Sequence, residues 1–160
     1  MTVYVADEQA RPLDVEQLQR LAQYVLADQR VPEAMELLVL CVDRDVIAEL
    51  NARHMGAQGP TDVLAFPIDL PGETSPGEPA LLGDVVLCPE IAALRAGPDP
   101  HAVNAEVELL VVHGILHLLG YDHAEPIERD RMFRLTERLL AGFRGEDARR
   151  ETGLPGTERS

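Results

Sequence analysis

The sequence predicts an α+β fold in which a small mixed sheet of about four strands packs with about five helices. Short apolar runs of strand length alternate with longer segments whose apolar residues recur at helical spacing. The strands are few and their connections vary, which favours an α+β layer arrangement over a doubly wound sheet. No internal repeat or second domain is visible. We therefore expect one domain over residues 1–145 and a polar, disordered tail over residues 146–160.

Four apolar runs indicate the strands. The run over residues 36–42 (ELLVLCV) is continuous, as in a central strand that is covered on both faces. The other three runs cover residues 3–5, 61–67 and 82–87. Residues 69–80 contain three prolines and two glycines, which predicts a loop or a short hairpin arm between the last two strands.

Five segments have helical character. Asp14 is a suitable N-cap for the first helix, and Pro89 suits the first turn of a short one. In the second helix, Val46, Ile47 and Leu50 are expected to face the core. The predicted helices cover residues 14–30, a stretch after Asp43, and residues 90–95, 103–119 and 126–140.

The charge balance restricts the partners of the protein. Twenty-eight acidic residues and 14 basic ones give a formal net charge of −14, and every basic residue is an arginine because the chain has no lysine. Polyphosphate chains should be repelled at long range, so any nucleic-acid contact must use a few local arginines. The alternative is a solvated acidic surface that has no bearing on partners.

The chain has the character of a cytoplasmic protein with no membrane partner. No run approaches the roughly 20 apolar residues that a membrane helix needs, and residues 1–10 do not resemble a secretory signal. Cys41 and Cys88 lie singly within apolar runs, which favours reduced, buried thiols over a disulfide.

Three of the five histidines fall within the segment HGILHLLGYDH, residues 113–123. His113 and His117 are four residues apart, so a helix projects both imidazoles from one face. Gly120 can end the helix in a left-handed conformation, and the returning chain can bring His123 to the same point. Three neutral imidazoles leave a fourth tetrahedral position for water, as in catalytic zinc sites. We therefore predict one zinc ion per chain, held by His113, His117 and His123.

The alternative is that one or two of these histidines belong to the core. The three occupy the positions of the metzincin signature HExxHxxGxxH, glycine included, which favours the metal site. Gly114 stands where that signature has the glutamate that acts as general base, so peptidase activity is not expected. Beyond a water on the metal, the candidate catalytic groups are Asp122 and Glu125. Both can instead cap the helix that follows.

Three segments together resemble the YbeY family of ribosome-associated, zinc-dependent endoribonucleases. HGILHLLGYDH is similar to the family's HGxLHLxGYDH, residues 60–67 (PTDVLAFP) to PT[DN]VLSFP, and residues 82–90 (LGDVVLCPE) to LGDIxIxPE. The resemblance covers residues 36–140. It implies an α+β fold with zinc at the end of a cleft. It also implies a metal-dependent endoribonuclease specific for single-stranded RNA, with roles in 16S rRNA 3′-end maturation and ribosome quality control.

Two positions depart from the family pattern. Met55 stands where many members have an arginine that the resemblance links to RNA, and Ala65 replaces a serine. The nearest basic groups are Arg53 and His54. With Thr61 and Asp62, which match the family pattern, they are the candidate substrate-binding residues. For Thr61 and Asp62, turn capping at the strand entry is an equal alternative.

Two accounts of RNA cleavage stay open at this stage. A metal-activated water can attack the phosphodiester, or the 2′-hydroxyl of the RNA can attack while the metal stabilises charge. A different class of function is a ribosome-assembly factor that docks on basic proteins of the small ribosomal subunit and has little nuclease activity. Hydrolysis of a peptide or small substrate is a third alternative, which Gly114 disfavours.

Overall fold

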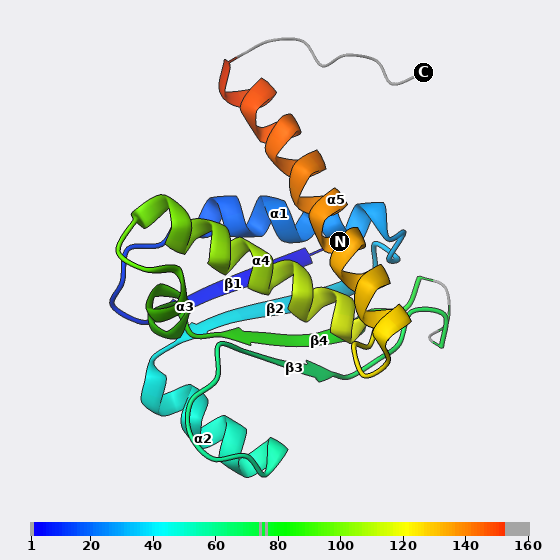
Figure 1. Cartoon of the computed structure of the whole chain (residues 1–160). Coiled ribbons are helices and arrows are strands. Elements are labelled where there is room, and N and C mark those ends of the chain that lie inside the picture. Colours follow the sequence, from blue (N-terminus) through cyan, green and yellow to red (C-terminus); the bar gives the residue numbers. More distant parts are fainter. Residues whose placement is uncertain (1, 74, 76, 153–160) are drawn as a thin grey trace.

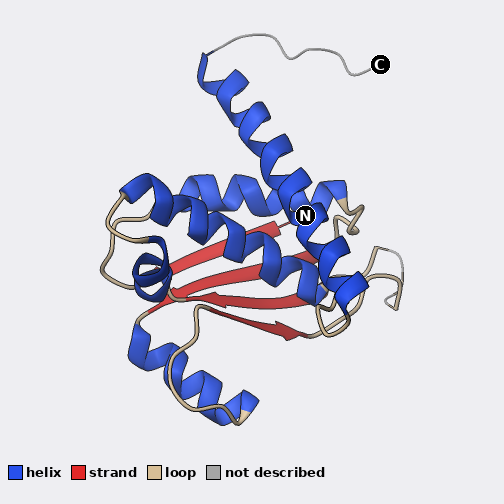
Figure 2. Cartoon of the chain, in the orientation of Figure 1, coloured by secondary structure: helices blue, strands red, loops and turns tan. Residues whose placement is uncertain are grey.

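The computed structural model describes residues 2–73, 75 and 77–152, and within them it has the predicted α+β architecture. One mixed sheet has the strand order β1-β2-β4-β3 (Figure 2). Strands β1, β2 and β4 are parallel, and β3 runs antiparallel to β4 at one edge. The strands are β1 (Thr2–Glu8), β2 (Met35–Val42), β3 (Val63–Pro67) and β4 (Ala80–Leu87).

Helices α1 (Val15–Asp28) and α4 (Pro100–Leu118) cover one face of the sheet, and α5 (Pro126–Thr152) packs on these two helices (Figure 1). The central helix α4 is apolar on most of its surface because it is enclosed by the sheet on one side and by α1 and α5 on the others. Its buried residues include Val111, Val112 and Ile115, which are 0% exposed. This burial fixes the position of α4, and therefore of the side chains at its end.

Among the residues that the structure describes, α2 (Arg44–Met55) is the helix that packs on the opposite face of the sheet, at one end (Figure 1). Ile47 is fully buried there and Leu50 packs against the same small cluster. The expectation for Val46 is wrong, because that side chain is 42% exposed. Helix α2 meets the sheet along one narrow stripe, which accommodates residues three or four positions apart but not the neighbouring position 46. Helix α3 (Pro89–Ala96) follows β4 and packs against α4.

Local signals set most of the element boundaries. The Asp14 side chain accepts a hydrogen bond from the Gln17 backbone N–H, which confirms it as the N-cap of α1. Pro89 is the first residue of α3, as expected. Both cysteines are buried and free, and burial raises the pKa of Cys41 to about 12. No helix among the described residues is long and apolar enough to cross a membrane.

Helices α4 and α5 are both longer than predicted. Helix α4 begins at Pro100 because a proline is favourable at the first helical position, and the Asp99 side chain accepts the His101 backbone N–H. Helix α5 continues to Thr152, beyond the predicted end at residue 140 and into the segment that we expected to be a disordered tail. Residues 153–160 of that segment lie outside the described residues.

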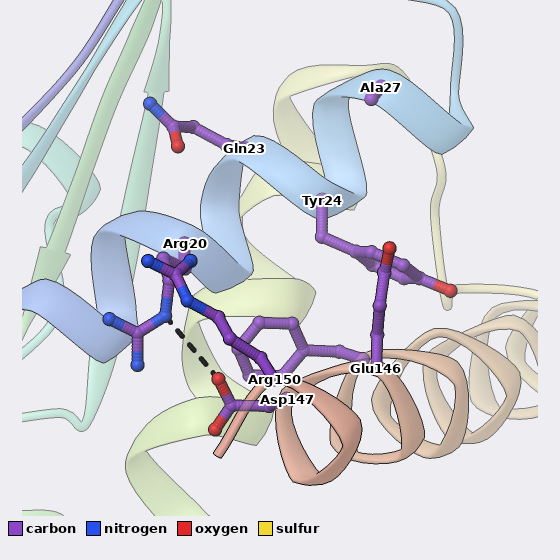
Figure 3. A pocket seen from close by; sticks show the side chains of 8 residues that line it. Arg20, Gln23, Tyr24, Ala27, Glu146, Asp147 and Arg150 are labelled. Carbon is purple, nitrogen blue, oxygen red and sulfur yellow. Dashed lines mark ion pairs between the residues drawn. The ribbon is translucent and has the colours of Figure 1, made fainter. Parts of the chain in front are cut away.

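Contacts with α1 and α4 explain why α5 continues. A Cβ at Gly142 would lie 2.2 Å from the Tyr24 hydroxyl oxygen, so this glycine allows α5 to approach α1 closely. The Tyr24 and Phe143 rings then meet edge to face, with centroids 5.8 Å apart. Further along, Asp147 forms an ion pair with Arg20 at 3.4 Å (Figure 3). These tertiary contacts offset the low helix propensity of the glycines in this segment.

Candidate metal centre

Helix α4 presents His113 and His117 on one face, one turn apart and half-buried. Their ring centroids are 5.0 Å apart. The helix holds them in place because the residues on its other faces are buried in the core. The spacing of four residues therefore produces the geometry that the sequence predicted for this pair.

Gly114, between these two histidines, lies directly against the sheet. A Cβ at this position would be 2.5 Å from Cγ1 of Val85, a fully buried residue of β4. Helix α4 thus approaches β4 too closely for any side chain at position 114. The absence of the glutamate found in the peptidase signature has a structural reason, since its side chain would have to enter the core.

The third histidine reaches the pair through a tight helix end. Gly120 has φ 98, its N–H donates to the His117 carbonyl, and the Tyr121 N–H donates to the Leu116 carbonyl. This pattern is a Schellman motif, which reverses the chain. Asp122 then accepts hydrogen bonds from the backbone N–H groups of His123 and Ala124, at 2.7 and 3.2 Å. The side chain of Asp122 therefore shapes the turn that carries His123.

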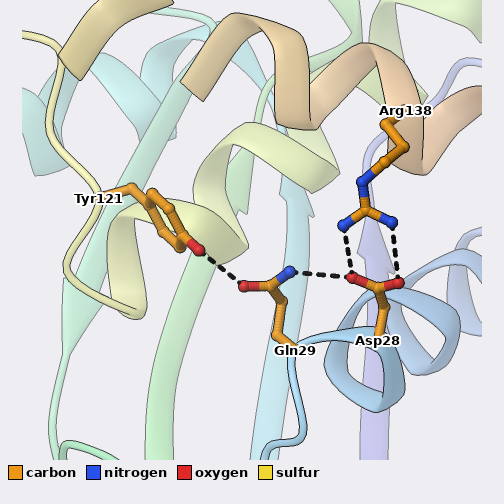
Figure 4. A network of polar contacts seen from close by, with 4 residues as sticks. All are labelled: Asp28, Gln29, Tyr121 and Arg138. Carbon is orange, nitrogen blue, oxygen red and sulfur yellow. Dashed lines mark hydrogen bonds and ion pairs between the residues drawn. The ribbon is translucent and has the colours of Figure 1, made fainter. Parts of the chain in front are cut away.

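A polar network ties this turn to two other helices (Figure 4). The Tyr121 hydroxyl donates to Oε1 of Gln29, and Nε2 of Gln29 donates to Asp28, both at 2.9 Å. Arg138 of α5 donates two hydrogen bonds to the Asp28 carboxylate, at 3.1 and 2.9 Å. These hydrogen bonds lower the pKa of Asp28. The turn before His123 is therefore attached to the end of α1 and to α5.

The three imidazoles converge. The His123 ring centroid lies 5.7 Å from that of His113 and 4.9 Å from that of His117. One ring nitrogen from each residue lies within 4.8 Å of the others, so the three can hold one metal ion. Burial lowers the pKa of His113 and His117, and the neighbouring imidazoles lower it further. Both rings are therefore neutral near pH 7, which is the state that ligates a metal.

A hollow of about 480 Å³ opens beside the histidines. Thr61, Asp62 and the first residues of β3 line it, together with Met55 at the end of α2. Asp62 is a buried residue at the start of this wall, and it forms an ion pair with Arg95 of α3. Its volume is ordinary for a ligand pocket, and the three histidines are among its lining residues.

The structure separates the other predicted site residues into two groups. Thr61 and Asp62 line the hollow, whereas Arg53 and His54 are not among its lining residues. Arg53 forms an ion pair with Glu49 on its own helix, at 2.6 Å. The His54 ring packs on Phe66, with centroids 5.3 Å apart.

Neither of the two candidate catalytic carboxylates, Asp122 and Glu125, lines the hollow where a general base would be needed. Asp122 bonds to the backbone of its own turn, and Glu125 is exposed and does not line the hollow. The residue that sequence reasoning missed is Arg95. It lies 33 positions from Asp62, so no local pattern could have connected the two.

Fold and site together define an α+β protein with a three-histidine site that can hold a metal ion at the side of an open hollow. Residues 4–144 match the family model described as Endoribonuclease YbeY. The chain therefore belongs to the YbeY family of endoribonucleases.

Individual relatives agree with this assignment. The chain is 52% identical to the Endoribonuclease YbeY of Thermobifida fusca, over 90% of this chain and 95% of the relative. It is 49% identical to the Endoribonuclease YbeY of Salinispora tropica, over 93% of this chain and the whole of the relative. A solution structure from Thermotoga maritima matches with a TM-score of 0.61 and 25% identity, over 99% of both chains.

Proposed function

We propose that this chain is a zinc-dependent endoribonuclease that cuts single-stranded RNA at the three-histidine site. One observation carries the proposal: three imidazoles converge within 4.8 Å in the wall of a hollow that is open to solvent. Sites with three protein ligands and an open position are typical of catalytic zinc, whereas structural zinc sites are closed by four ligands. Membership of an endoribonuclease family supports RNA as the substrate.

The roles of the chain's own residues follow from their places. His113, His117 and His123 would hold the ion, which when bound supplies a Lewis acid and an activated water. Asp122 orients the backbone at His123 and so positions that ligand. Thr61 and Asp62 lie in the wall of the hollow, which supports a role for this wall in holding the RNA strand. Gly114 leaves α4 without a general base beside the ligands.

The biological setting is proposed from the family resemblance. The RNA would be the 3′ end of 16S rRNA, and the partners would be the small ribosomal subunit and its proteins, in the cytoplasm. A role in ribosome quality control belongs to the same proposal. All of these require the nuclease activity to be present in this chain.

The experiment is cleavage of a single-stranded RNA by the full chain, without a histidine tag, in three forms: wild type, His117→Ala, and wild type in excess chelator. We expect cleavage by the wild type only, because the other two forms lack an intact metal site. Equal cleavage by all three would mean a contaminating nuclease and would refute the proposal. The ends of the RNA products distinguish attack by water from attack by the RNA's own 2′-hydroxyl. A 2′,3′-cyclic phosphate end excludes direct attack by water.

A ribosome-assembly factor with little nuclease activity is the second candidate. The observation that favours it is the formal net charge of −14, which suits docking on basic ribosomal proteins better than on RNA. Under this candidate, the protein would co-sediment with small ribosomal subunits while the wild type failed the cleavage assay. Cleavage that depends on His117 excludes it.

A further inference from the structure

None of the described residues that line the hollow carries a fixed positive charge, so apart from the metal ion proposed for the three histidines the wall offers little to hold a polyanion. Among the described residues that line it, the histidines are the only basic ones. Met55 contributes an uncharged side chain and Asp62 a carboxylate. An RNA phosphate that approached this wall would meet a negative group on a protein of net charge −14. Proteins that bind single-stranded RNA usually line the path of the strand with cations, so we expect one beside this wall.

Arg95 is not itself a lining residue, but it is paired with Asp62, which is one. It lies near the end of α3, and its Nη1 forms an ion pair with Oδ2 of Asp62. The Asp62 side chain is only 10% exposed, whereas the Arg95 side chain is 59% exposed. The carboxylate thus holds one nitrogen of the guanidinium beside a residue of the wall, and more than half of the Arg95 side chain is exposed to solvent. An arginine has five N–H donors, so donors remain for a second anion.

We propose that Arg95, oriented by Asp62, binds a phosphate of the RNA strand beside the three-histidine site. This inference rests on the proposed function, because it names a contact to the same substrate. The ion pair between Arg95 and Asp62 reduces the repulsion that the Asp62 carboxylate would exert on an RNA phosphate. Asp62 is neutralised by Arg95, and the planar guanidinium offers further N–H groups to a phosphate oxygen. Arg53, which is closer in sequence to Met55, is paired with Glu49, an exposed residue of its own helix that does not line the hollow.

The test is the affinity of the full, metal-depleted chain for a short fluorescent oligouridylate, measured by anisotropy at several salt concentrations. Metal depletion separates binding from cleavage. We expect Arg95→Ala to weaken binding on the order of tenfold, as for the loss of a charge-assisted hydrogen bond. The slope of log affinity against log salt should fall by about 0.7, the value for one phosphate contact to a single strand.

The control variant is Arg134→Ala. Arg134 is 77% exposed on α5 and pairs with Asp130 one turn away, so its loss removes the same charge at another place. It should leave both the affinity and the salt slope unchanged. An equal loss in the two variants would overturn the proposal, because it would reflect net charge alone. Melting temperatures of the variants check that each is folded.

A second background separates phosphate binding from simple neutralisation of Asp62. Asp62→Asn removes the charge but keeps a side-chain oxygen that can accept a hydrogen bond from Arg95. If Arg95 touches the RNA, Arg95→Ala should therefore still weaken binding in the Asp62→Asn protein, and Arg95→Lys should restore part of the loss. No effect of Arg95→Ala in the Asp62→Asn background would overturn the proposal. The cleavage assay distinguishes failure of the Arg95 proposal from failure of the proposed nuclease activity. Wild-type cleavage with an unchanged Arg95→Ala affinity refutes only the Arg95 contact, and RNA binding without cleavage refutes only the nuclease.

Discussion

Gly114→Ala tests directly whether helix α4 approaches strand β4 too closely for a side chain at position 114. The new Cβ would lie 2.5 Å from Val85 Cγ1, where ordinary contacts begin at 3.4 Å, an overlap of about 0.9 Å. Val85 is fully buried and β-branched, so it cannot rotate away cheaply. Overpacking of this kind costs about 1–3 kcal/mol, and the higher helix propensity of alanine returns about 1 kcal/mol. We expect a net loss of about 1 kcal/mol in the free energy of unfolding.

A double-mutant cycle isolates the clash. In a Val85→Ala protein both Cγ atoms are gone, and the nearest remaining atom is the Cβ at 3.4 Å. Gly114→Ala should then stabilise the protein by up to about 1 kcal/mol, which reverses its sign. Urea unfolding of the four proteins gives a coupling energy, for which we expect about 1–3 kcal/mol. A coupling below about 0.5 kcal/mol, or a wild-type background in which Gly114→Ala stabilises, would refute this account of Gly114.

Three further predictions concern the metal, the turn network and a buried carboxylate. Chelator should lower the melting temperature, because the ligands join α4 to the turn at His123; an unchanged value would contradict this. Arg138→Gln should lower the free energy of unfolding by up to about 1 kcal/mol at neutral pH. Arg138 lowers the pKa of Asp28, so the stability that their ion pair contributes should be lost as Asp28 is protonated below pH 3.8. A loss in Arg138→Gln that does not change with pH would contradict this prediction. Burial raises the pKa of Glu108, so the contribution of Glu108 to the free energy of unfolding should fall as pH rises above 4.5. Glu108→Gln should therefore melt higher than wild type at pH 8 but not at pH 4; a gap that does not depend on pH would argue against this.

The features that the sequence predicted well are those that depend on neighbours along the chain. The cap at Asp14 and the proline at the start of α3 are local signals, and the structure confirms them. The histidine cluster was predictable for the same reason. A spacing of four residues and a glycine at the helix end are enough to bring His113, His117 and His123 together.

The features that were missed depend on contacts between distant segments. Gly142 and Gly145 lower helix propensity, so the pattern favoured an early end to α5, yet the contact with Tyr24 requires a glycine at position 142. The exposure of Val46 depends on how narrowly α2 meets the sheet. The pairing of Arg95 with Asp62 joins a helix to a loop 33 residues away. The local residue pattern of a single sequence does not show which distant segments come into contact.

The most direct test of the metal-centre account is a zinc titration of metal-depleted protein, followed by the initial rate of single-stranded RNA cleavage. The account predicts a rate that rises from the baseline and levels off sharply at one ion per chain, because the three histidines form one site. His117→Ala should stay at the baseline over the same range. A rate that does not respond to zinc, or an equal response in His117→Ala, would contradict the assignment of catalysis to this site.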